Sequence, residues 1–223
     1  MTDLTDQRIM ATAQDALSAK EAAVHAGYYD DNFVKAFSRG HTNRRPHVEP
    51  LIKRGTHARV CCMDRAIATF IDLHQQNNNL LEQKKNGEGS LQVVVLGAGK
   101  DTSFFRYITG RLNNSNSREK QTPQPPQTKV RWYEIDHETV LSEKVAAIAN
   151  APHVFDATVT ANGEHGWKLQ SSKHKNKHNN NDNSSNNHDE VSTCSTDAGE
   201  SSCCYMVSHD LRQDPQTLLE HMS

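Results

Sequence analysis

The sequence predicts an α/β fold of the nucleotide-binding kind, preceded by a helical segment, and three observations support this prediction. Residues 91–96 form a short β-branched apolar run that ends in Gly97-Ala98-Gly99. A second strand-like run, residues 130–135, ends in Asp136. Before residue 73, apolar side chains recur at helical spacing. A glycine turn after the first strand and a carboxylate after the second are typical of parallel sheets that bind a nucleotide at their carboxyl ends.

The spacing of the two strands fits such a unit once one polar segment is set aside. Gly97 and Asp136 lie 39 positions apart, whereas roughly 20 are expected. Residues 113–128 contain only Asn, Ser, Gln, Pro, Thr and charged side chains, and without these 16 residues the distance is 23. The alternative interpretation is an ordinary strand–helix–strand unit in which the glycines serve only the tight turn.

The residues after the glycine turn narrow the class of ligand. A dinucleotide site requires Gly or Ala where this chain has Thr102. Asp101 near the start of the following helix would oppose a pyrophosphate. The pattern therefore favours an uncharged or cationic ligand, and S-adenosylmethionine fits that description.

The remaining elements follow from periodicity and from helix start and stop signals. Helices are expected over residues 6–26, ended by Gly27, and over 33–37. Residues 41–50 are expected to form a loop, and 56–72 an amphipathic helix with Val60, Met63, Ile67, Phe70 and Ile71 on one face. Further helices are expected over residues 102–112, 138–149 and 215–222, and strands over 204–209 and, more weakly, 154–159 and 167–170. The sheet is thus expected to contain about four strands.

Composition excludes several other classes of protein. The net charge of −2 gives no reason to expect nucleic acid or a lipid surface as partner. We expect neither a secretory signal nor a membrane span, and the five cysteines without a Cys-x-x-Cys motif favour a reducing, cytoplasmic location. Residues 171–190 contain no apolar side chain, so they cannot support a packed core.

Metal binding is an alternative for the histidines and cysteines of the carboxyl-terminal third, namely His174, His178, His188, Cys194, Cys203 and Cys204. The His-x-x-x-His spacing would suit a helix, but an Asn/Ser-rich stretch does not favour one. Low complexity explains these histidines more simply.

Five short motifs occur in one order along the chain. They are Lys20 with the following Gly27-Tyr28-Tyr29-Asp30, then residues 54–60 (RGTHARV), 96–102 (LGAGKDT), 133–136 (YEID) and 210–212 (DLR). In this order the chain resembles the leucine carboxyl methyltransferase family, over most of its length outside the polar segments 75–90, 113–128 and 171–190.

The resemblance implies a class I S-adenosylmethionine-dependent methyltransferase, with a Rossmann-like sheet and an N-terminal helical cap. The cap would comprise residues 1–90. Residues 91–223 would form a partial methyltransferase domain with low-complexity insertions at about 113–128 and 171–203. The family continues past the position of Ser223, so the fold is expected to be incomplete at the carboxyl terminus, as in a fragment, a truncated gene model or a degenerate copy.

The resemblance also assigns the cofactor-binding residues. Lys20 and Arg59 would contact the methionine carboxylate, Gly97 the methionine and ribose, and Asp136 the ribose hydroxyls. Asp210 and Leu211 would border the adenine. The residue types suit these roles, because cations bind carboxylates and carboxylates accept hydrogen bonds from a diol. The alternatives are that Lys20 and Arg59 are solvated surface residues, and that Asp136 and Asp210 cap the following helices.

The activity implied is methylation of the C-terminal leucine carboxylate of the protein phosphatase 2A catalytic subunit, whose tail would be the partner of a monomeric enzyme. That carboxylate is ionised at pH 7, so we assign no catalytic acid or base. Alternatives within the family are a tRNA base precursor or a small carboxylic acid as acceptor. An alternative from another class is a non-catalytic cofactor-binding fragment, with an exposed sheet edge beyond residues 204–210.

Overall fold

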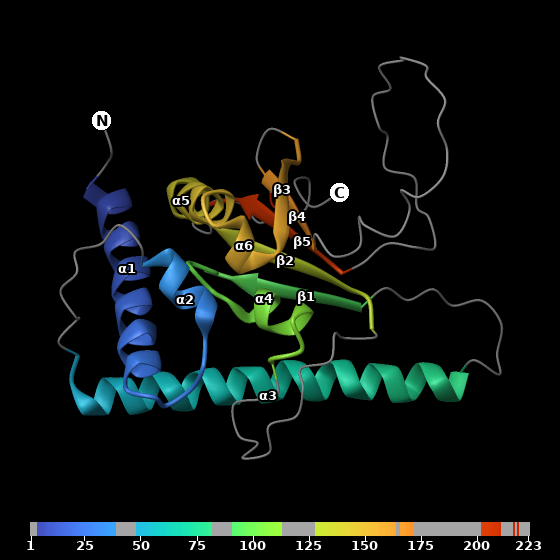
Figure 1. Cartoon of the computed structure of the whole chain (residues 1–223). Helices are drawn as coiled ribbons and strands as arrows, with labels where there is room; N and C mark the ends of the chain where they lie inside the picture. The colour runs from blue at the N-terminus through green and yellow to red at the C-terminus, as the bar shows by residue number, and fades with distance from the viewer. Residues whose placement is uncertain are drawn as a thin grey trace.

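A computed structural model describes residues 4–38, 48–81, 91–112, 128–163, 166–171 and 202–210, together with 216 and 218 (Figure 1). Its elements are α1 (Leu4–His25), α2 (Asn32–Phe37), α3 (Pro50–Leu81), β1 (Leu91–Leu96), α4 (Ser103–Ile108), β2 (Val130–Asp136), α5 (Glu138–Ala149), α6 (Pro152–Phe155), β3 (Ala157–Ala161), β4 (Gly166–Ser171) and β5 (Cys203–Ser208). None of the described helices is long and apolar enough to cross a membrane.

The first two helices confirm the sequence prediction. Helix α1 ends where Gly27 adopts a φ of +75°, a left-handed conformation that glycine adopts without strain. Helix α2 begins at the cap residue Asp31, whose side chain accepts hydrogen bonds from the backbone N–H groups of Phe33 and Val34. The apolar side chains of α2 are then buried.

Helix α3 is longer than expected and presents a different face. It begins at Pro50, a residue suited to the first helical turn, and so includes part of the expected loop. Val60 and Ile71 are buried, as predicted. Met63 and Phe70 are more than half exposed, so their assignment to the same buried face was wrong. Val60, Asp64, Ala68 and Ile71 are buried on one side of the helix, and Met63 and Phe70, seven residues apart, lie beside that side rather than on it.

The sheet has five strands in the order β1-β2-β5-β4-β3. The first three are parallel, whereas β4 is antiparallel to both β5 and β3. Residues 154 and 155 belong to helix α6 rather than to a strand, and the left-handed Asp156 separates that helix from β3. The mixed α/β sheet confirms the predicted fold class.

The edge strands of the described sheet are β1 and β3, not β5. Among the described strands β1 pairs only with β2, while β4 covers the far side of β5. Val94 and Leu96 of β1 are exposed, although Gln92 is the strand's one polar residue. The expected edge beyond residues 204–210 was therefore wrong, because the β3–β4 hairpin, a weak signal in the sequence, occupies that position.

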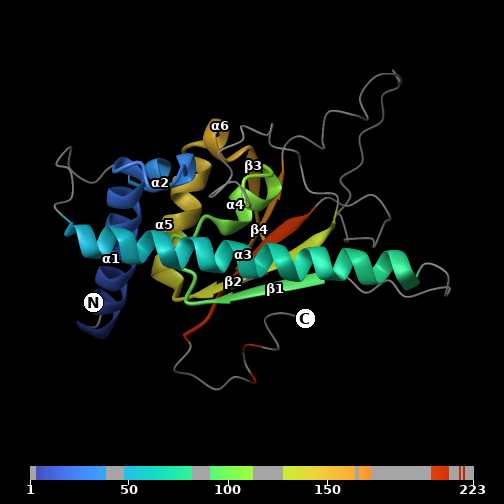
Figure 2. The ribbon, with the colours of Figure 1, turned by 90° about the horizontal axis from the view of Figure 1, so that it is seen from below.

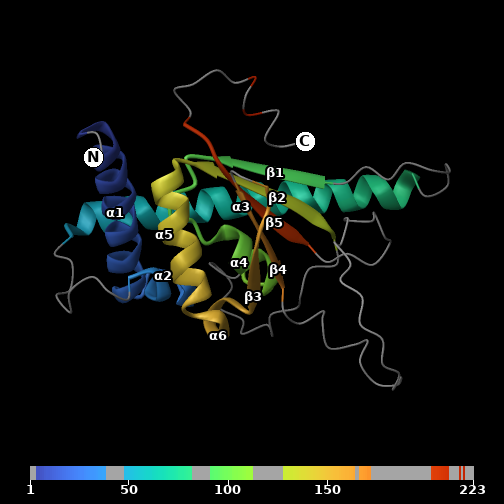
Figure 3. The same ribbon diagram turned by 90° about the horizontal axis from the view of Figure 1, so that it is seen from above.

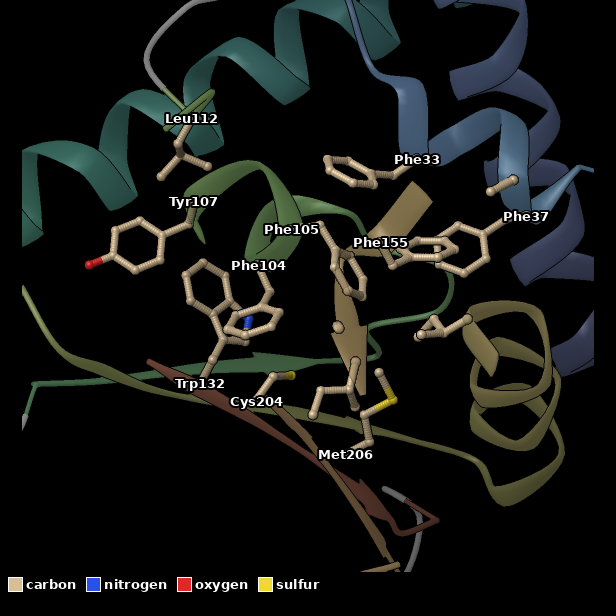
Figure 4. Packing of buried hydrophobic residues seen from close by; sticks show 14 of the residues in the cluster. Phe33, Phe37, Phe104, Phe105, Tyr107, Leu112, Trp132, Phe155, Cys204 and Met206 are labelled. Carbon is tan, nitrogen blue, oxygen red and sulfur yellow. The ribbon is translucent and has the colours of Figure 1, made fainter. Parts of the chain in front are cut away.

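The carboxyl ends of β1 and β2 point toward α1 and α2, while α3 runs lengthwise beneath the sheet, along β1 but in the opposite chain direction (Figures 1, 2 and 3). Helix α4 lies between α3 and the sheet (Figures 1 and 4). It is shorter than the expected 102–112, because the chain turns at Gly110 with a φ of +68°. Helix α5 has the bounds predicted.

One hydrophobic core joins the early helices to the sheet (Figure 4). Phe33 and Phe37 of α2 pack on Phe155, with ring centroids 5.7 and 5.0 Å apart. Phe105 of α4 lies 4.7 Å from Phe155, and Trp132 of β2 is fully buried nearby. The division of the chain at residue 90 remains a prediction, and most of the polar segments at 113–128 and 171–203 lie outside the described residues.

Candidate functional site

Backbone hydrogen bonds to the end of β2 fix the glycine turn that follows β1. Gly97 and Gly99 have φ values of +64° and +53°, so both positions require a residue that tolerates the left-handed region. The N–H groups of Gly97 and Ala98 donate to the carbonyl of Ile135, at 2.9 and 3.2 Å. A Cβ atom added at either glycine would meet no protein atom within 4 Å. The turn therefore leaves space beside its backbone for a ligand.

Asp136 lies at this turn, where its two carboxylate oxygens have different partners. Oδ2 accepts from the N–H of Gly99 at 2.6 Å. Oδ1 accepts from the N–H of His137, the residue before α5, at 2.7 Å. The side chain therefore connects the two strand ends, which capping of the following helix alone would not do. Its remaining lone pairs can accept hydrogen bonds from a diol.

Lys20 reaches the same turn from helix α1. Its ammonium Nζ lies 3.1 Å from Oδ2 of Asp101, with both side chains about one-fifth exposed. Oδ1 of Asp101 accepts from the N–H of Ser103 at 2.7 Å. Burial alone would raise the pKa of Asp101, but the ammonium groups of Lys20 and Lys144 and the hydrogen bonds from Ser103 outweigh it and hold that pKa well below its usual range. Asp101 is thus a fixed negative charge beside Lys20.

A buried lysine of α5 binds the backbone of the glycine turn. Lys144 of α5 donates to the backbone carbonyl of Asp101 at 2.7 Å and to Glu134 of β2 at 2.6 Å. The Lys144 and Glu134 side chains are fully buried. Because the lysine that binds this carbonyl is itself held by a buried carboxylate of β2, the backbone at Asp101 has little freedom to move.

A second ionic cluster joins α2, α3 and α4 next to the turn. Arg106 forms ion pairs with Asp31 and Asp64, and all three side chains are buried. Thr102 donates to Asp31 at 2.6 Å. The two carboxylates outweigh the effect of burial and raise the pKa of Arg106, which keeps the guanidinium charged. The sequence analysis missed this cluster; the available signal was an arginine inside the otherwise apolar helix that follows the glycine motif.

Arg59 is an exposed residue of α3, and no hydrogen bond or ion pair joins its side chain to another described residue. Its neighbour Val60 packs with Ala23 and Tyr29. Since Ala23 is three residues after Lys20 on α1, the two cations lie on helices that contact each other there. The structure thus brings their helices together, but among the described residues the Arg59 side chain forms no hydrogen bond or ion pair with the glycine turn.

Strand β5 brings Asp210 to the same end of the sheet as Asp136. Ser208 is the register partner of Asp136, and the N–H of His209 donates to the Asp136 carbonyl at 2.9 Å. Asp210 follows directly and is partly buried. Leu211, the other residue expected beside the adenine, lies outside the described residues.

The metal alternative falls largely outside the described part of the chain, which includes none of the three histidines and not Cys194. Cys203 and Cys204 are buried in β5. Among the described residues no group of His, Cys, Asp and Glu side chains could hold a metal ion.

The site's residue types fit S-adenosylmethionine. A lysine is available for a carboxylate, a strand-end carboxylate for a ribose diol, and open glycine backbone lies between them. Lys100, next to the start of the helix after the turn, is more deeply buried than Lys20 and pairs with Glu143 at 2.9 Å, which disfavours its use for a phosphate there.

Comparison with known proteins gives a consistent result. The family model for leucine carboxyl methyltransferase matches residues 8–220. "Leucine carboxyl methyltransferase 1" of Schizosaccharomyces pombe is 36% identical over 101 residues, which are 45% of this chain and 27% of that protein. The protein of the same name from Emericella nidulans is 30% identical over 148 residues, 66% of this chain and 33% of the relative. The protein of the same name from Rattus norvegicus is 26% identical over 154 residues, which are 69% of this chain and 37% of the relative.

The matched region thus spans about a third of the length of these curated relatives. On this chain, however, the family model extends over nearly every residue, including the glycine turn and all three parallel strands. The chain therefore belongs to the leucine carboxyl methyltransferase family.

Proposed function

We propose that this protein uses S-adenosylmethionine to methylate the carboxylate of a C-terminal leucine, with the tail of the protein phosphatase 2A catalytic subunit as acceptor. The observation that carries the proposal is the glycine turn of a family member, bracketed by Lys20 on one side and Asp136 on the other. The relatives' names refer to leucine carboxyl methylation, and the acceptor protein follows from the resemblance described above.

We assign the cofactor-binding roles as follows. Lys20 and Arg59 bind the methionine carboxylate, and Gly97 lines the methionine and ribose. Asp136 accepts hydrogen bonds from the ribose hydroxyls, while Asp210 and Leu211 border the adenine. Support comes from the shared location of Lys20, Gly97, Asp136 and Asp210 at the carboxyl ends of the parallel strands.

The bound cofactor would supply an electrophilic methyl group on a sulfonium. The acceptor carboxylate is already ionised at neutral pH, so the protein need not remove a proton. The tasks left to the chain are to orient the cofactor against the acceptor and to exclude water from the reacting atoms. A cytoplasmic, monomeric enzyme would suit this role, and both properties belong to the proposal.

Titration calorimetry of S-adenosylmethionine into the 223-residue chain tests the cofactor assignment. We expect the wild type to bind and Arg59→Ala to lose at least about tenfold in affinity, because a guanidinium–carboxylate pair is a strong, directional contact. Arg65→Ala is the matched control, since Arg65 is an exposed arginine on the same helix. Equal affinities for the two variants would contradict the role of Arg59.

Methyl transfer is then measured with a leucine-terminated peptide carrying the phosphatase tail sequence and with the same peptide amidated at its carboxyl terminus. Labelling of the free acid alone supports the proposed acceptor group. Cofactor binding without labelling of either peptide would contradict carboxyl methylation and favour a cofactor-binding module without this activity.

A further inference from the structure

We propose that Asp101 is the positioning residue for Lys20, which it holds at the glycine turn in the orientation that binds the methionine carboxylate. The inference rests on the proposed function. The observation that carries it is the ion pair between two residues 81 positions apart, one on α1 and one in the glycine motif itself.

Asp101 is the fixed member of this pair. Its Oδ1 is held by the N–H of Ser103, and its backbone carbonyl by the buried Lys144. The next residue, Thr102, is tied to Asp31. Lys20, in contrast, has a flexible four-carbon side chain, and among the residues that the structure describes its only polar partner is Asp101. Asp101 therefore determines where the Lys20 ammonium lies, whereas Lys20 does not determine the position of Asp101.

Such a contact prepares Lys20 for a ligand. A lysine ammonium has three donors, and the bond to Oδ2 of Asp101 uses one of them. Two donors remain for an incoming carboxylate. Because the flexible side chain is already ordered in the ligand-free protein, less rotamer entropy is lost when the ligand binds.

The nearby charges favour a role of Asp101 in positioning Lys20 over a role in which Asp101 opposes binding of the ligand carboxylate. The charged groups around Asp101 are Lys20, Lys144, Glu134, Arg106 and Asp64. Lys144 pairs with Glu134, and Arg106 pairs with Asp31 and Asp64. Lys20 is therefore the cation whose ion pair is with Asp101. If Asp101 instead competed with the ligand for Lys20, its removal would tighten binding. The two interpretations thus predict opposite changes in affinity.

The test is calorimetric titration of the full chain with two ligands, S-adenosylmethionine and methylthioadenosine, which keeps the adenosine but has no amino-acid carboxylate. Asp101→Asn retains an oxygen for the N–H of Ser103 and removes the charge. We expect it to weaken S-adenosylmethionine about tenfold and to leave methylthioadenosine unchanged. Glu143→Gln is the matched control, since it breaks the neighbouring ion pair of the same turn without touching Lys20.

A double-mutant cycle with Lys20→Gln separates positioning from a direct contact. If Asp101 acts through Lys20, the double variant binds S-adenosylmethionine no more weakly than Lys20→Gln alone. Should Asp101→Asn fail to fold, Asp101→Glu, which keeps the charge and displaces it by one methylene, is expected to show a smaller loss for S-adenosylmethionine only.

Three results would overturn the inference: unchanged or tighter binding of S-adenosylmethionine to Asp101→Asn, equal losses for both ligands, or additive effects in the cycle. In each of these the wild type still binds, so the proposed function stands. A folded wild type that binds neither ligand overturns the proposed function and the inference together.

Discussion

Asp136 illustrates how much depends on a single side chain at the end of β2. Asp136→Asn removes the charge from the group that we assign to the ribose hydroxyls. Because hydrogen bonds to charged groups contribute about 1.5–3 kcal/mol, we expect weaker binding of S-adenosylmethionine and methylthioadenosine alike, as measured by calorimetry. Glu138→Gln, which changes an exposed carboxylate two residues further on, serves as the control. If Asp136→Asn weakened the binding of only one of the two ligands, that result would contradict the ribose assignment.

The lowered pKa of Asp101 also predicts how the stability of the folded protein depends on pH. Its pKa is lowered in the folded protein, so its stabilising contribution is present above the unfolded pKa of about 3.9. That contribution is lost as the pH falls toward the folded value. We therefore expect Asp101→Asn to be less stable than wild type in urea unfolding at pH 7, and the difference to shrink at about pH 3.

The exposed Asp30→Asn variant should follow the wild-type profile. A gap between wild type and Asp101→Asn that widens on acidification would contradict the lowered pKa.

At the scale of residues, local parts of the site could be predicted and distant contacts could not. Gly97 and Asp136 follow directly from strand ends that pair in parallel, so their proximity could be inferred from the sequence. The contact of Lys20 with Asp101 depends on how α1 packs against the sheet, and no periodicity in the sequence determines that packing. The position of Arg59 relative to the turn has the same origin.

At the scale of elements, Arg106 holds three helices together. Arg106→Met would leave the carboxylates of Asp31 and Asp64 buried without their cation. Breaking a buried ion pair in this way costs about 3–5 kcal/mol, and we expect that loss in the free energy of unfolding measured with urea. Arg111→Met, an exposed arginine just beyond the same helix, should change the unfolding free energy by less than about 0.5 kcal/mol. Similar values for both variants would contradict the cluster's role.

The sequence predicted elements well where one signal dominated. Helix α5 and strands β1, β2 and β5 have continuous apolar or periodic patterns, and their predicted positions were confirmed. The hairpin of β3 and β4 was harder, because residues 154–159 are apolar enough for either a helix or a strand, and the left-handed Asp156 divides them between both. The carboxyl-terminal extent of α3 was underestimated because its last turns contain three consecutive Asn residues, and Asn is a weak helix former.

At the scale of the molecule, α2 shares its aromatic core with the sheet layer. Phe33 contacts both Phe105 and Phe155, at centroid distances of 5.4 and 5.7 Å. Phe33→Ala is expected to cost about 3–5 kcal/mol. Because the core is continuous, the loss should appear in one cooperative transition, with coincident changes in tryptophan fluorescence and far-ultraviolet circular dichroism.

Phe70→Ala removes an exposed ring from α3 and provides the control. Two separate transitions, of which only one responded to Phe33→Ala, would mean that the helical cap and the sheet unfold independently.

The antiparallel pairing of β4 with β5 has a consequence for the connection between these two strands. The register places Gln170 opposite Cys203, so the two ends of the connection over residues 172–202 are neighbours in the sheet. The entropy of closing a flexible loop grows only with the logarithm of its length, and a doubling costs about 0.6 kcal/mol. A change in the number of residues between two strand ends that are already neighbours therefore has little effect on the stability of the paired strands.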